Sequence, residues 1–431
     1  MTDKPNLYPA FYRDFAQPAM LALARAGNRG CLIDVPLRRT FAESARARVA
    51  EAQAVLDAAV GSELNCNSPK QVKALLYDRL KLPEQYKFTG KKRSVSSDNE
   101  AISKLQRSYP EHDTVLSAIL GVRQGLKEAQ QHEVKLEQRP EGEVFPTSYN
   151  ATGTKTGRIS SSATLLGFGD NLQNRKRGPS RKCFRARPGM IFVKADGSQA
   201  EARVVAALCR DTALLERFAD PGFDIHAENA AMIYHVTEAE VQAQAKEYKA
   251  AGRGDSWRQR TKGITHGANY QGGPKVAVKQ ADIPFAEAKM AIAAYRRSRP
   301  LMLSWWDRVE ETVILTRRIR TCWGRLRVFF KRIDARCLRE ATAQEPQSTV
   351  GDLINHAFFR LDESLASLGA YPLLQAHDEI VCEAPLGTED EVATLLQAEM
   401  QFPLPMETGP LVIPAEVQIG PNWGELEAWS G

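Results

Sequence analysis

Two aspartates stand where short apolar strands are expected to end. Asp196 closes the stretch Met190 to Asp196, and Asp378 lies at the tip of an expected hairpin, Tyr371 to Ala384. Two carboxylates brought to one sheet edge would repel each other unless a cation neutralised them. Hard oxygen ligands of this kind suit Mg²⁺, and a pair of ions about 4 Å apart supports phosphoryl transfer. Taken singly, each aspartate fits an ordinary turn residue better than a metal ligand, and no local pattern brings the two together.

A second set of residues could bind phosphates on one face of a helix. Arg258, Lys262, His266 and Tyr270 are spaced by four residues. At helical spacing such residues share about one-third of the circumference. The two cations would hold phosphate oxygens, and the aromatic end would stack on a base. The same spacing also fits a solvent-exposed basic face, so the pattern leaves both interpretations open.

The elements that must position these residues follow the order helices, strands, helices, strands. This order differs from the βαβ alternation of a parallel sheet and predicts an α+β chain with an antiparallel sheet. Helices are expected over 17–60, 70–82, 101–137, from Glu201, over 211–315 and over 339–365; strands over 190–196, around the Gly324 turn, over 371–384 and over 411–419; and a basic loop over 86–98.

Length and composition narrow the class of protein. The 431 residues are enough for two or three packed units. No apolar run is long enough for a membrane span, and the first ten residues do not resemble a signal peptide. The seven cysteines are scattered and lack CxxC spacing, which indicates reduced thiols in a cytoplasmic protein and disfavours a zinc site or a disulfide framework.

Positive charge is concentrated in the middle of the chain. Residues 150–210 carry 12 Lys and Arg against 3 Asp and Glu, whereas residues 211–431 carry 24 against 31. A local excess of this size is what a phosphate-rich partner needs. It is also compatible with a solvated basic surface, so charge alone does not decide for nucleic acid.

Three separated motifs make the pattern specific. In chain order these are Asp196-Gly-Ser-Gln-Ala-Glu-Ala-Arg203, Arg258-Gln-Arg-Thr-Lys-Gly-Ile-Thr-His-Gly-Ala-Asn-Tyr270 and Gln375-Ala-His-Asp-Glu379. They resemble motifs A, B and C of the family A DNA polymerases, the bacterial DNA polymerase I type. The resemblance continues through Leu64–Gln71, Thr156–Ser162, Asn171–Asn174, Asp224–Glu228, Trp323–Arg325, Gln347–Asp352 and Glu416–Trp423, and so covers nearly the whole chain.

The resemblance implies a right-hand architecture. Residues 1–145 would form a helical thumb, residues 146–210 and 316–431 an antiparallel-sheet palm, and residues 211–315 helical fingers that carry the motif B helix. It also implies an activity, that of a DNA-directed DNA polymerase. This nucleotidyltransferase would extend a primer 3′-hydroxyl with dNTPs on template DNA and release pyrophosphate.

The resemblance further assigns roles to residues. Asp196 and Asp378 would bind two Mg²⁺ ions, for which Mn²⁺ can substitute, and Glu379 would support the site. Lys262 would also be a proton donor to the leaving pyrophosphate. The expected dNTP-binding residues are Arg258, Lys262, His266, Tyr270, Glu201 and His226. The expected DNA-binding residues are Arg158, Arg339, Gln347, Gln375 and His377, which would test the shape of base pairs from the minor groove.

The chain departs from the family pattern around the expected nucleotide site. Gly197 stands where the family usually has Tyr, His266 where it has Phe or Tyr, and Gln271 where it has Gly. Ala200 replaces a larger aliphatic residue, Ala343 replaces an Asn, and 165–169 resembles an insertion. These departures leave fidelity, sugar discrimination and dideoxynucleotide use open. The expected metal ligands and cations are intact, so activity is still expected.

Further expectations concern the whole protein. Because the match starts almost at residue 1, we expect no 3′→5′ proofreading and no 5′ nuclease in this chain. A compact, divergent form fits either a phage enzyme of DNA replication, located in the host cytoplasm, or a domain fragment. We expect a monomer and leave accessory replication proteins open. Two alternatives are a single-subunit RNA polymerase, disfavoured by Glu201 at the sugar position, and a non-catalytic DNA-binding relative, disfavoured by the intact site residues.

Overall fold

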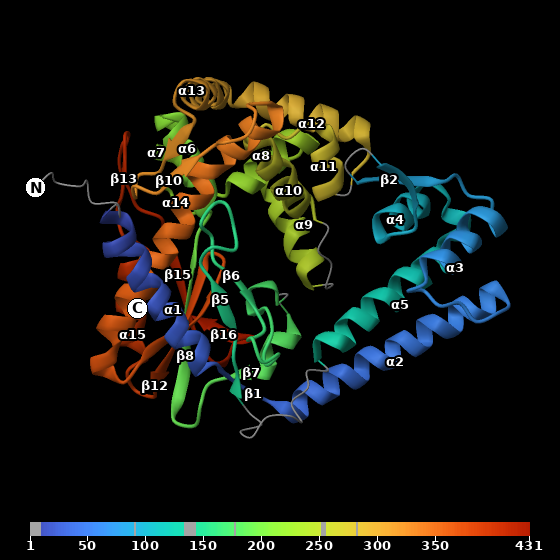
Figure 1. Ribbon diagram of the computed structural model, residues 1–431, viewed down its shortest axis with the longest axis horizontal. Coiled ribbons are helices and arrows are strands. Elements are labelled where there is room, and N and C mark those ends of the chain that lie inside the picture. The colour runs from blue at the N-terminus through green and yellow to red at the C-terminus, as the bar shows by residue number, and fades with distance from the viewer. Residues whose placement is uncertain (1–9, 90–91, 133–143, 176–177, 251–255, 282) are drawn as a thin grey trace, which may run out of the picture. The chain divides into compact units, whose positions relative to one another are not determined.

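The chain forms two compact units (Figure 1). A computed structural model describes residues 10–89, 92–132, 144–175, 178–250, 256–281 and 283–431. Unit 1 comprises Met1–Cys31, Pro146–Arg175 and Ala186–Gly431, and unit 2 comprises Leu32–Phe145 and Lys176–Arg185. Residues 10–31 therefore belong to the unit that contains the candidate site. The thumb, palm and fingers boundaries inferred from the sequence stay predictions.

An antiparallel sheet organises unit 1. Its strands run in the order β11 (Tyr371–Ala376), β12 (Glu379–Pro385), β8 (Met190–Gly197), β15 (Ala415–Asn422), and β16 (Glu425–Ala428) pairs with β15. The antiparallel sheet expected from the sequence is therefore present. Smaller two-stranded pairs are β5 (Ser148–Asn150) with β6 (Ser160–Ser162), β9 (Arg318–Arg320) with β10 (Leu326–Val328), and β13 (Leu404–Met406) with β14 (Gly409–Leu411).

The two faces of this sheet differ in character. Side chains alternate between faces along a strand, and Val193 and Ala195 of β8 are buried in one core with Ile380 of β12 and Val417 of β15. Helices α1 (Gln17–Arg29), α14 (Ala335–Ser364) and α15 (Glu389–Met400) contribute Leu23, Phe358 and Leu396 to the same core. Lys194 and Asp196 alternate with these buried residues along β8 and therefore point to the opposite face of the sheet.

The remaining helices of unit 1 lie between β8 and β9 in the chain. They are α6 (Ala200–Cys209), α7 (Thr212–Arg217), α8 (Ile225–Tyr234), α9 (Glu238–Ala250), α10 (Trp257–Asn269), α11 (Pro274–Ala281), α12 (Phe285–Ser298) and α13 (Pro300–Thr316). The helical region expected over 211–315 is thus confirmed in the described residues. Gly252 predicts a break in this helical region, but this glycine lies outside the described residues. Short helical turns occur at Tyr12–Ala16, Leu172–Asn174 and Leu365–Leu368.

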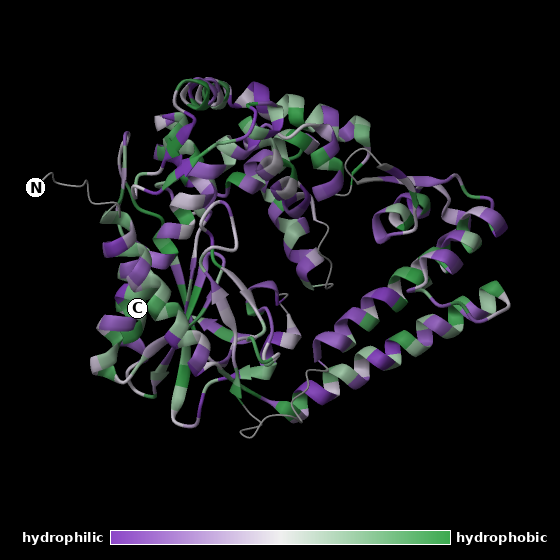
Figure 2. Cartoon of the chain, viewed as in Figure 1, coloured by the Kyte–Doolittle hydropathy of each residue, from purple (hydrophilic) through white to green (hydrophobic). Residues whose placement is uncertain are grey.

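Unit 2 is built on two long helices. These are α2 (Val35–Val60) and α5 (Asp113–His132), joined by α3 (Pro69–Lys73), a helical turn at Ala74–Arg79, and α4 (Asn99–Ser108). Asp34 caps α2 by accepting the Leu37 N–H, and Gly61 ends it with a φ of 75°. Figure 2 shows hydrophobic and hydrophilic residues alternating around α2 and α5, as expected for helices with one buried face. Short strands β1 (Cys31–Ile33), β4 (Val144–Phe145) and β7 (Phe184–Arg185) and turns at Pro110–His112 and Pro179–Cys183 complete the unit.

The loop expected over 86–98 is wrong, because this segment forms a hairpin. Strands β2 (Gln85–Thr89) and β3 (Lys92–Ser96) pair in register with Tyr86 opposite Val95. An aromatic residue facing a β-branched one stabilises such a pair, and the Arg93 guanidinium lies 3.5 Å from the centre of the Tyr86 ring. Charge and polarity hid this pairing, since the segment carries few of the apolar residues that mark a buried strand.

Across the described residues no helix has the length and apolar character of a membrane span.

Half-buried His356 on α14 makes the stability of unit 1 sensitive to acid. Its ring is surrounded by Trp323, Phe402 and Phe359 at centroid distances of 5.0, 4.5 and 5.3 Å. Burial, with help from Arg360, lowers the pKa of His356 to about 4. An unfolded histidine binds its proton near pH 6.5, so the unfolded state gains protons first. Stability contributed by neutral His356 is therefore present above pH 6.5 and is lost as the pH falls toward 4.

We expect His356→Phe to reduce the loss of stability between pH 7 and pH 5 by about 1 kcal/mol, allowing for the partial exposure of the ring. Urea unfolding followed by tryptophan fluorescence at both pH values measures this difference. His235→Asn is the matched control, because it removes an exposed imidazole. The same pH dependence in the wild type and His356→Phe would contradict the assignment.

Candidate active site

The structure brings the two expected metal ligands to neighbouring strand ends. Asp196 lies near the end of β8, where it is paired in register with Glu379 at the start of β12. The Gly197 N–H donates a hydrogen bond of 3.1 Å to the backbone carbonyl of Asp378. Asp196 and Asp378 are both half-buried. Sheet pairing therefore supplies the proximity that no local pattern in the sequence could establish.

Glu379 is held differently from the two aspartates. It is 2% exposed, and the Trp423 indole N–H donates to its carboxylate at 2.9 Å. The Lys194 ammonium lies 3.8 Å from the other carboxylate oxygen. On the far side of β8, Glu416 of β15 is paired with Asp196 and is exposed. A carboxylate held by an indole and an ammonium fits a supporting role better than that of an open metal ligand.

The ligand chemistry at Asp196 and Asp378 fits magnesium better than a transition metal. Within the described ranges, no group of three or more His, Cys, Asp and Glu side chains is placed to form a closed metal site. Zinc sites need three or four such ligands, whereas Mg²⁺ commonly takes one or two carboxylates and completes its shell with water and phosphate oxygens. Two half-buried carboxylates at neighbouring strand ends meet that requirement.

Glu201 is the centre of a second cluster. It lies in the first turn of α6, a short distance along the chain from Asp196. Its carboxylate accepts hydrogen bonds from the Arg158 guanidinium at 3.0 Å and from the Tyr270 hydroxyl. His266 Nδ1 lies 3.5 Å from the same carboxylate, and its ring meets the Tyr270 ring edge-on at 5.4 Å. Four expected site residues from three distant motifs are thus in contact.

Helix α10 carries the expected phosphate-binding face. Its N-terminus is capped by Ser256, whose side chain accepts the Gln259 N–H. Arg258, Lys262 and His266 lie on the helix, and Tyr270 follows directly after its last residue. The stripe predicted from the spacing is therefore correct for three residues, and Tyr270 extends it from the C-cap. Arg258 Nε donates to Asp224 at 2.5 Å.

The Asp224 segment arranges charge around α10. The other carboxylate oxygen of Asp224 caps α8 by accepting the N–H groups of His226 and Ala227. Burial raises the pKa of Asp224, but the hydrogen bond and charge of Arg258 outweigh it and keep the pKa lowered. Burial and the nearby Lys262 and Arg258 cations lower the pKa of His226 to about 4. His226 is therefore neutral near pH 7.

The back of α10 packs closely on α11. A methyl group added at Gly263 would lie 3.0 Å from the Gln280 carbonyl, and one added at Gly267 would lie 2.9 Å from Val276. Beyond the helix, Gln271 has a φ of 59°, a conformation that favours glycine. Its side-chain amide donates to the Thr342 hydroxyl of α14 at 3.1 Å. This hydrogen bond links the end of α10 to α14 and is made by one of the residues that depart from the family pattern.

The expected DNA-binding residues are divided among three segments. Gln375 lies one residue before the end of β11 and accepts a 2.6 Å hydrogen bond from Gln173. His377 is exposed at the turn before Asp378, with a φ of 60°. Gln347 and Arg339 lie on α14, where Arg339 is exposed. Gln375 is buried and donates to the His377 carbonyl at 3.4 Å, whereas Gln347 is half-buried on α14.

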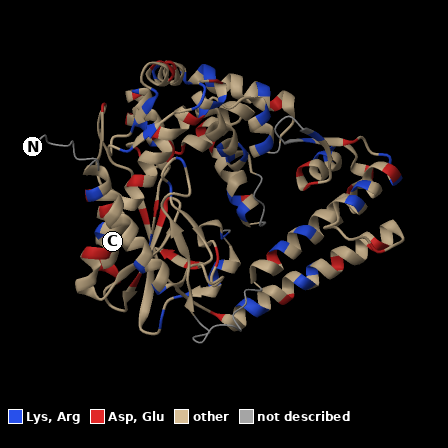
Figure 3. Ribbon diagram, viewed as in Figure 1, with Lys and Arg blue, Asp and Glu red and all other residues tan. Residues whose placement is uncertain are grey.

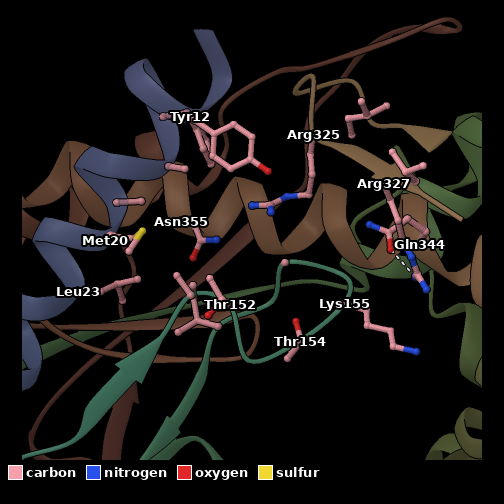
Figure 4. A pocket seen from close by; sticks show the side chains of 18 residues that line it. Tyr12, Met20, Leu23, Thr152, Thr154, Lys155, Arg325, Arg327, Gln344 and Asn355 are labelled. Carbon is pink, nitrogen blue, oxygen red and sulfur yellow. Dashed lines mark hydrogen bonds between the residues drawn. The ribbon is translucent and has the colours of Figure 1, made fainter. Parts of the chain in front are cut away.

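Arg158 is positioned by a loop that rests on Arg325. Gly157 has a φ of 79°, and a methyl group there would lie 2.4 Å from the Arg325 guanidinium. Arg325 donates in turn to both oxygens of buried Asp352. Figure 4 shows the cavity beside this contact, of about 360 Å³, with Arg325 and Arg327 on one side and Tyr12, Met20 and Leu23 on the other. The loop that carries Arg158 thus rests on the ion pair between Arg325 and Asp352.

Three supporting residues were not assigned roles from the sequence. Asp224 partners Arg258, Trp423 holds Glu379, and Arg325 fixes the loop of Arg158. All three lie in segments that match the family pattern. The sequence could therefore indicate that these residues belong to the site, because they lie in matching segments. It could not indicate which side chains they contact.

Comparison with known proteins agrees with this geometry. A family model described as DNA polymerase family A matches residues 37–425. The chain is 28% identical over 428 residues to DNA polymerase I of Deinococcus radiodurans, covering 96% of this chain and 42% of the relative. It is 31% identical over 428 residues to the thermostable DNA polymerase I of Thermus aquaticus, covering 95% of this chain and 47% of the relative. The chain thus spans less than half the length of these two relatives.

A solved structure matches in fold. It is the POL domain of Pol1 from M. smegmatis in complex with DNA primer-template and dNTP, with a TM-score of 0.82 and 24% identity. The match covers 96% of this chain and 71% of that chain. The α+β, right-hand polymerase fold expected from the sequence is therefore confirmed.

Proposed function

This chain belongs to DNA polymerase family A, and we propose that it extends the 3′-hydroxyl of a DNA primer with dNTPs on a DNA template. The reaction is phosphoryl transfer with release of pyrophosphate, in which the protein positions the reactants and neutralises charge. The relatives named above are DNA polymerases I, and the solved neighbour is a complex with DNA primer-template and dNTP. These likenesses support the substrates that we propose.

One observation supports the proposal most directly. Asp196 and Asp378 come from motifs far apart in the chain and meet at paired strand ends. We propose that they bind two Mg²⁺ ions, for which Mn²⁺ can substitute. Such ions, when bound, make a hydroxyl a better nucleophile and neutralise a leaving pyrophosphate. Glu379, held by Trp423 and Lys194, would keep the Asp378 turn in place.

The residues on α10 would handle the triphosphate. Arg258 and Lys262 would bind its oxygens, Lys262 would donate a proton to pyrophosphate, and neutral His226 would add a hydrogen bond without repelling the cations. Arg258 is held by Asp224. We propose that phosphate oxygens compete with Asp224 for Arg258 when a dNTP binds.

The cluster around Glu201 would select the sugar. Its carboxylate, fixed by Arg158 and Tyr270, would occupy the space that a ribose 2′-hydroxyl needs. Arg158 would thereby connect the sugar site to the terminal base pair. Gln347, Arg339, Gln375 and His377 would contact primer-template DNA on its minor-groove side.

Primer extension by the purified chain tests the proposal. A labelled primer-template is incubated with each dNTP singly and with the four NTPs, with and without Mg²⁺. We expect Mg²⁺-dependent addition of the templated dNTP alone. Efficient extension with NTPs would favour the RNA polymerase alternative, and DNA binding without extension under any metal would favour the non-catalytic one.

His266 offers a test of sugar recognition. A dideoxynucleotide lacks the 3′-hydroxyl and leaves a polar gap, which an imidazole N–H can fill and a phenyl ring cannot. We expect His266→Phe to lower dideoxynucleotide use relative to dNTP about fivefold, the value of one hydrogen bond, while leaving the metal dependence unchanged. Competition between ddNTP and dNTP in single-nucleotide extension measures the ratio. Equal ratios for the two enzymes would contradict this role.

Several expectations about the whole protein stay predictions. They are the thumb, palm and fingers boundaries, the phage origin, a cytoplasmic role in DNA replication, and the monomeric state. The solved structure supplies the fold, and the family model supplies the family.

A further inference from the structure

The hairpin β9–β10 presents an exposed surface with two different rows of side chains. In its register Arg320 faces Leu326 and Arg318 faces Val328. Arg318 and Arg320 are exposed, and Leu326 is 36% exposed. Because side chains alternate along strands, these four lie on one face of the hairpin. An arginine row therefore runs beside an aliphatic row.

The opposite face anchors the hairpin to the rest of unit 1. Ile319 is buried, and Arg327 donates to Gln344 of α14 at 2.7 Å and to Glu340 at 2.8 Å. Figure 4 shows Arg327 directed to Gln344, with the hydrogen bond drawn. The ion pairs of this face thus hold the hairpin in position. The exposed face has no such anchoring role in the contacts of the described residues.

The exposed surface continues past the end of β10. Phe329 is buried, whereas Phe330 is 89% exposed, so the alternation continues and Phe330 follows Leu326 and Val328 in the apolar row. Arg317 fixes this bend by donating to the carbonyls of Phe329 and Lys331 at 3.3 and 3.1 Å. Lys331 and Arg332 are both exposed. A phenyl ring is therefore presented between cations on a backbone that is held in place.

Charge identifies the partner that this surface fits. Residues 317–339 contain nine Lys and Arg and one acidic residue, Asp334, and Figure 3 colours these cations blue. Surfaces that bind single-stranded nucleic acid combine a cationic track for phosphates with rings on which bases stack. We propose that Arg318, Arg320, Leu326, Val328, Phe330, Lys331 and Arg332, the hairpin surface, bind single-stranded DNA. Phosphates would lie on the arginine row and an unstacked base on Phe330.

Single-stranded DNA explains more of the surface than duplex DNA or an acidic protein segment does. A duplex hides the faces of its bases and would leave Phe330 without a partner. An acidic peptide would pair with the arginines, whereas a phenyl ring that is 89% exposed is better matched by the flat face of an unstacked base. The proposal goes beyond the proposed primer extension, since it concerns residues outside the candidate active site.

Binding of an oligonucleotide in the absence of dNTP tests the proposal. The full chain is first saturated with an unlabelled hairpin primer-template that has a short overhang, and labelled oligo-dT of 12 nucleotides is then titrated by fluorescence anisotropy. We expect Phe330→Ala to weaken oligo-dT binding about fivefold or more. Phe330→Tyr should restore the affinity. Phe285→Ala, which removes another exposed phenyl ring, of 53% exposure on α12, is the matched control and should change nothing.

Two further measurements separate stacking from charge. On an abasic strand of equal length Phe330→Ala should have no effect. The double variant Arg318→Ala, Arg320→Ala should weaken both strands and reduce the slope of log affinity against log salt by roughly 1.4, about 0.7 for each phosphate contact.

Three outcomes would overturn the proposal: unchanged oligo-dT binding by Phe330→Ala, an equal loss on the abasic strand, or variants that keep DNA affinity but lose binding to an Asp- and Glu-rich peptide. The last would make the hairpin surface a protein-docking site. Because the assay contains no dNTP, its result is independent of primer extension, which is measured on the same variants. A chain that binds oligo-dT through Phe330 but extends no primer would refute only the proposed function.

Discussion

Replacing Asp378 with Asn is expected to lower primer extension by about 10³-fold or more. The substitution keeps the size of the side chain and removes the charge needed to hold divalent ions. Charge stabilisation by such ions is worth several kcal/mol, and each 1.36 kcal/mol corresponds to a tenfold change in rate. Single-turnover incorporation of one templated dNTP at saturating Mg²⁺ measures the effect. Primer-template affinity should stay within a factor of about two, because Asp378 is not among the residues expected to contact DNA.

A control of equal charge makes this result specific. Asp307 is an exposed aspartate on α13, and Asp307→Asn changes the net charge by the same amount. We expect its extension rate to match the wild type. Normal extension by Asp378→Asn would contradict the assignment of Asp196 and Asp378 as metal ligands. A parallel loss of DNA binding would instead indicate that the turn between β11 and β12 had been disrupted.

Replacing Lys262 with Ala is expected to reduce kcat/KM for the dNTP by about 10²- to 10³-fold. Lys262 is exposed on the face of α10 that also carries Arg258 and His266. It would stabilise charge that develops on the leaving pyrophosphate, and removing one such donor from an active site has an effect of this size. The dependence of the incorporation rate on dNTP concentration separates kcat from KM.

The variant Lys262→Arg distinguishes binding from proton donation. Arginine keeps the positive charge but does not give up its proton near neutral pH, so KM should be retained while kcat falls. Lys279→Ala on α11, which removes another exposed lysine, should behave as the wild type. If Lys262→Ala and Lys279→Ala gave the same small change, Lys262 would have no part in the chemistry.

Much of the secondary structure could be predicted because it is encoded by local patterns. The strand at 190–197, the hairpin at 371–385 and the helix at 257–269 each carry a periodicity of two or near 3.6 over their own length. The hairpin at 85–96 could not be predicted in this way, because its polar residues lack the apolar alternation of a half-buried strand. Its pairing depends on cross-strand contacts such as Tyr86 with Val95.

The sequence named candidate residues for the site but did not predict which of them contact one another. The family resemblance pointed to Glu201, Tyr270, His266 and Arg158. The structure shows that the last three meet at the Glu201 carboxylate. The partners Asp224 and Trp423 were not predicted. A side chain chooses its partner across the fold, where sequence distance carries no information.

For Asp196 and Asp378, the sequence by itself determined that each carboxylate follows an apolar strand, because apolar and polar residues alternate locally. It also determined the order of the motifs and the cationic face of α10. Only the tertiary structure decided that β12 pairs with β8 in the register that sets Glu379 opposite Asp196. A slip of one residue would have turned these carboxylates toward the core. Burial of Val193, Ala195 and Ile380 under α1, α14 and α15 selects that register, and such burial exists only once the chain is folded.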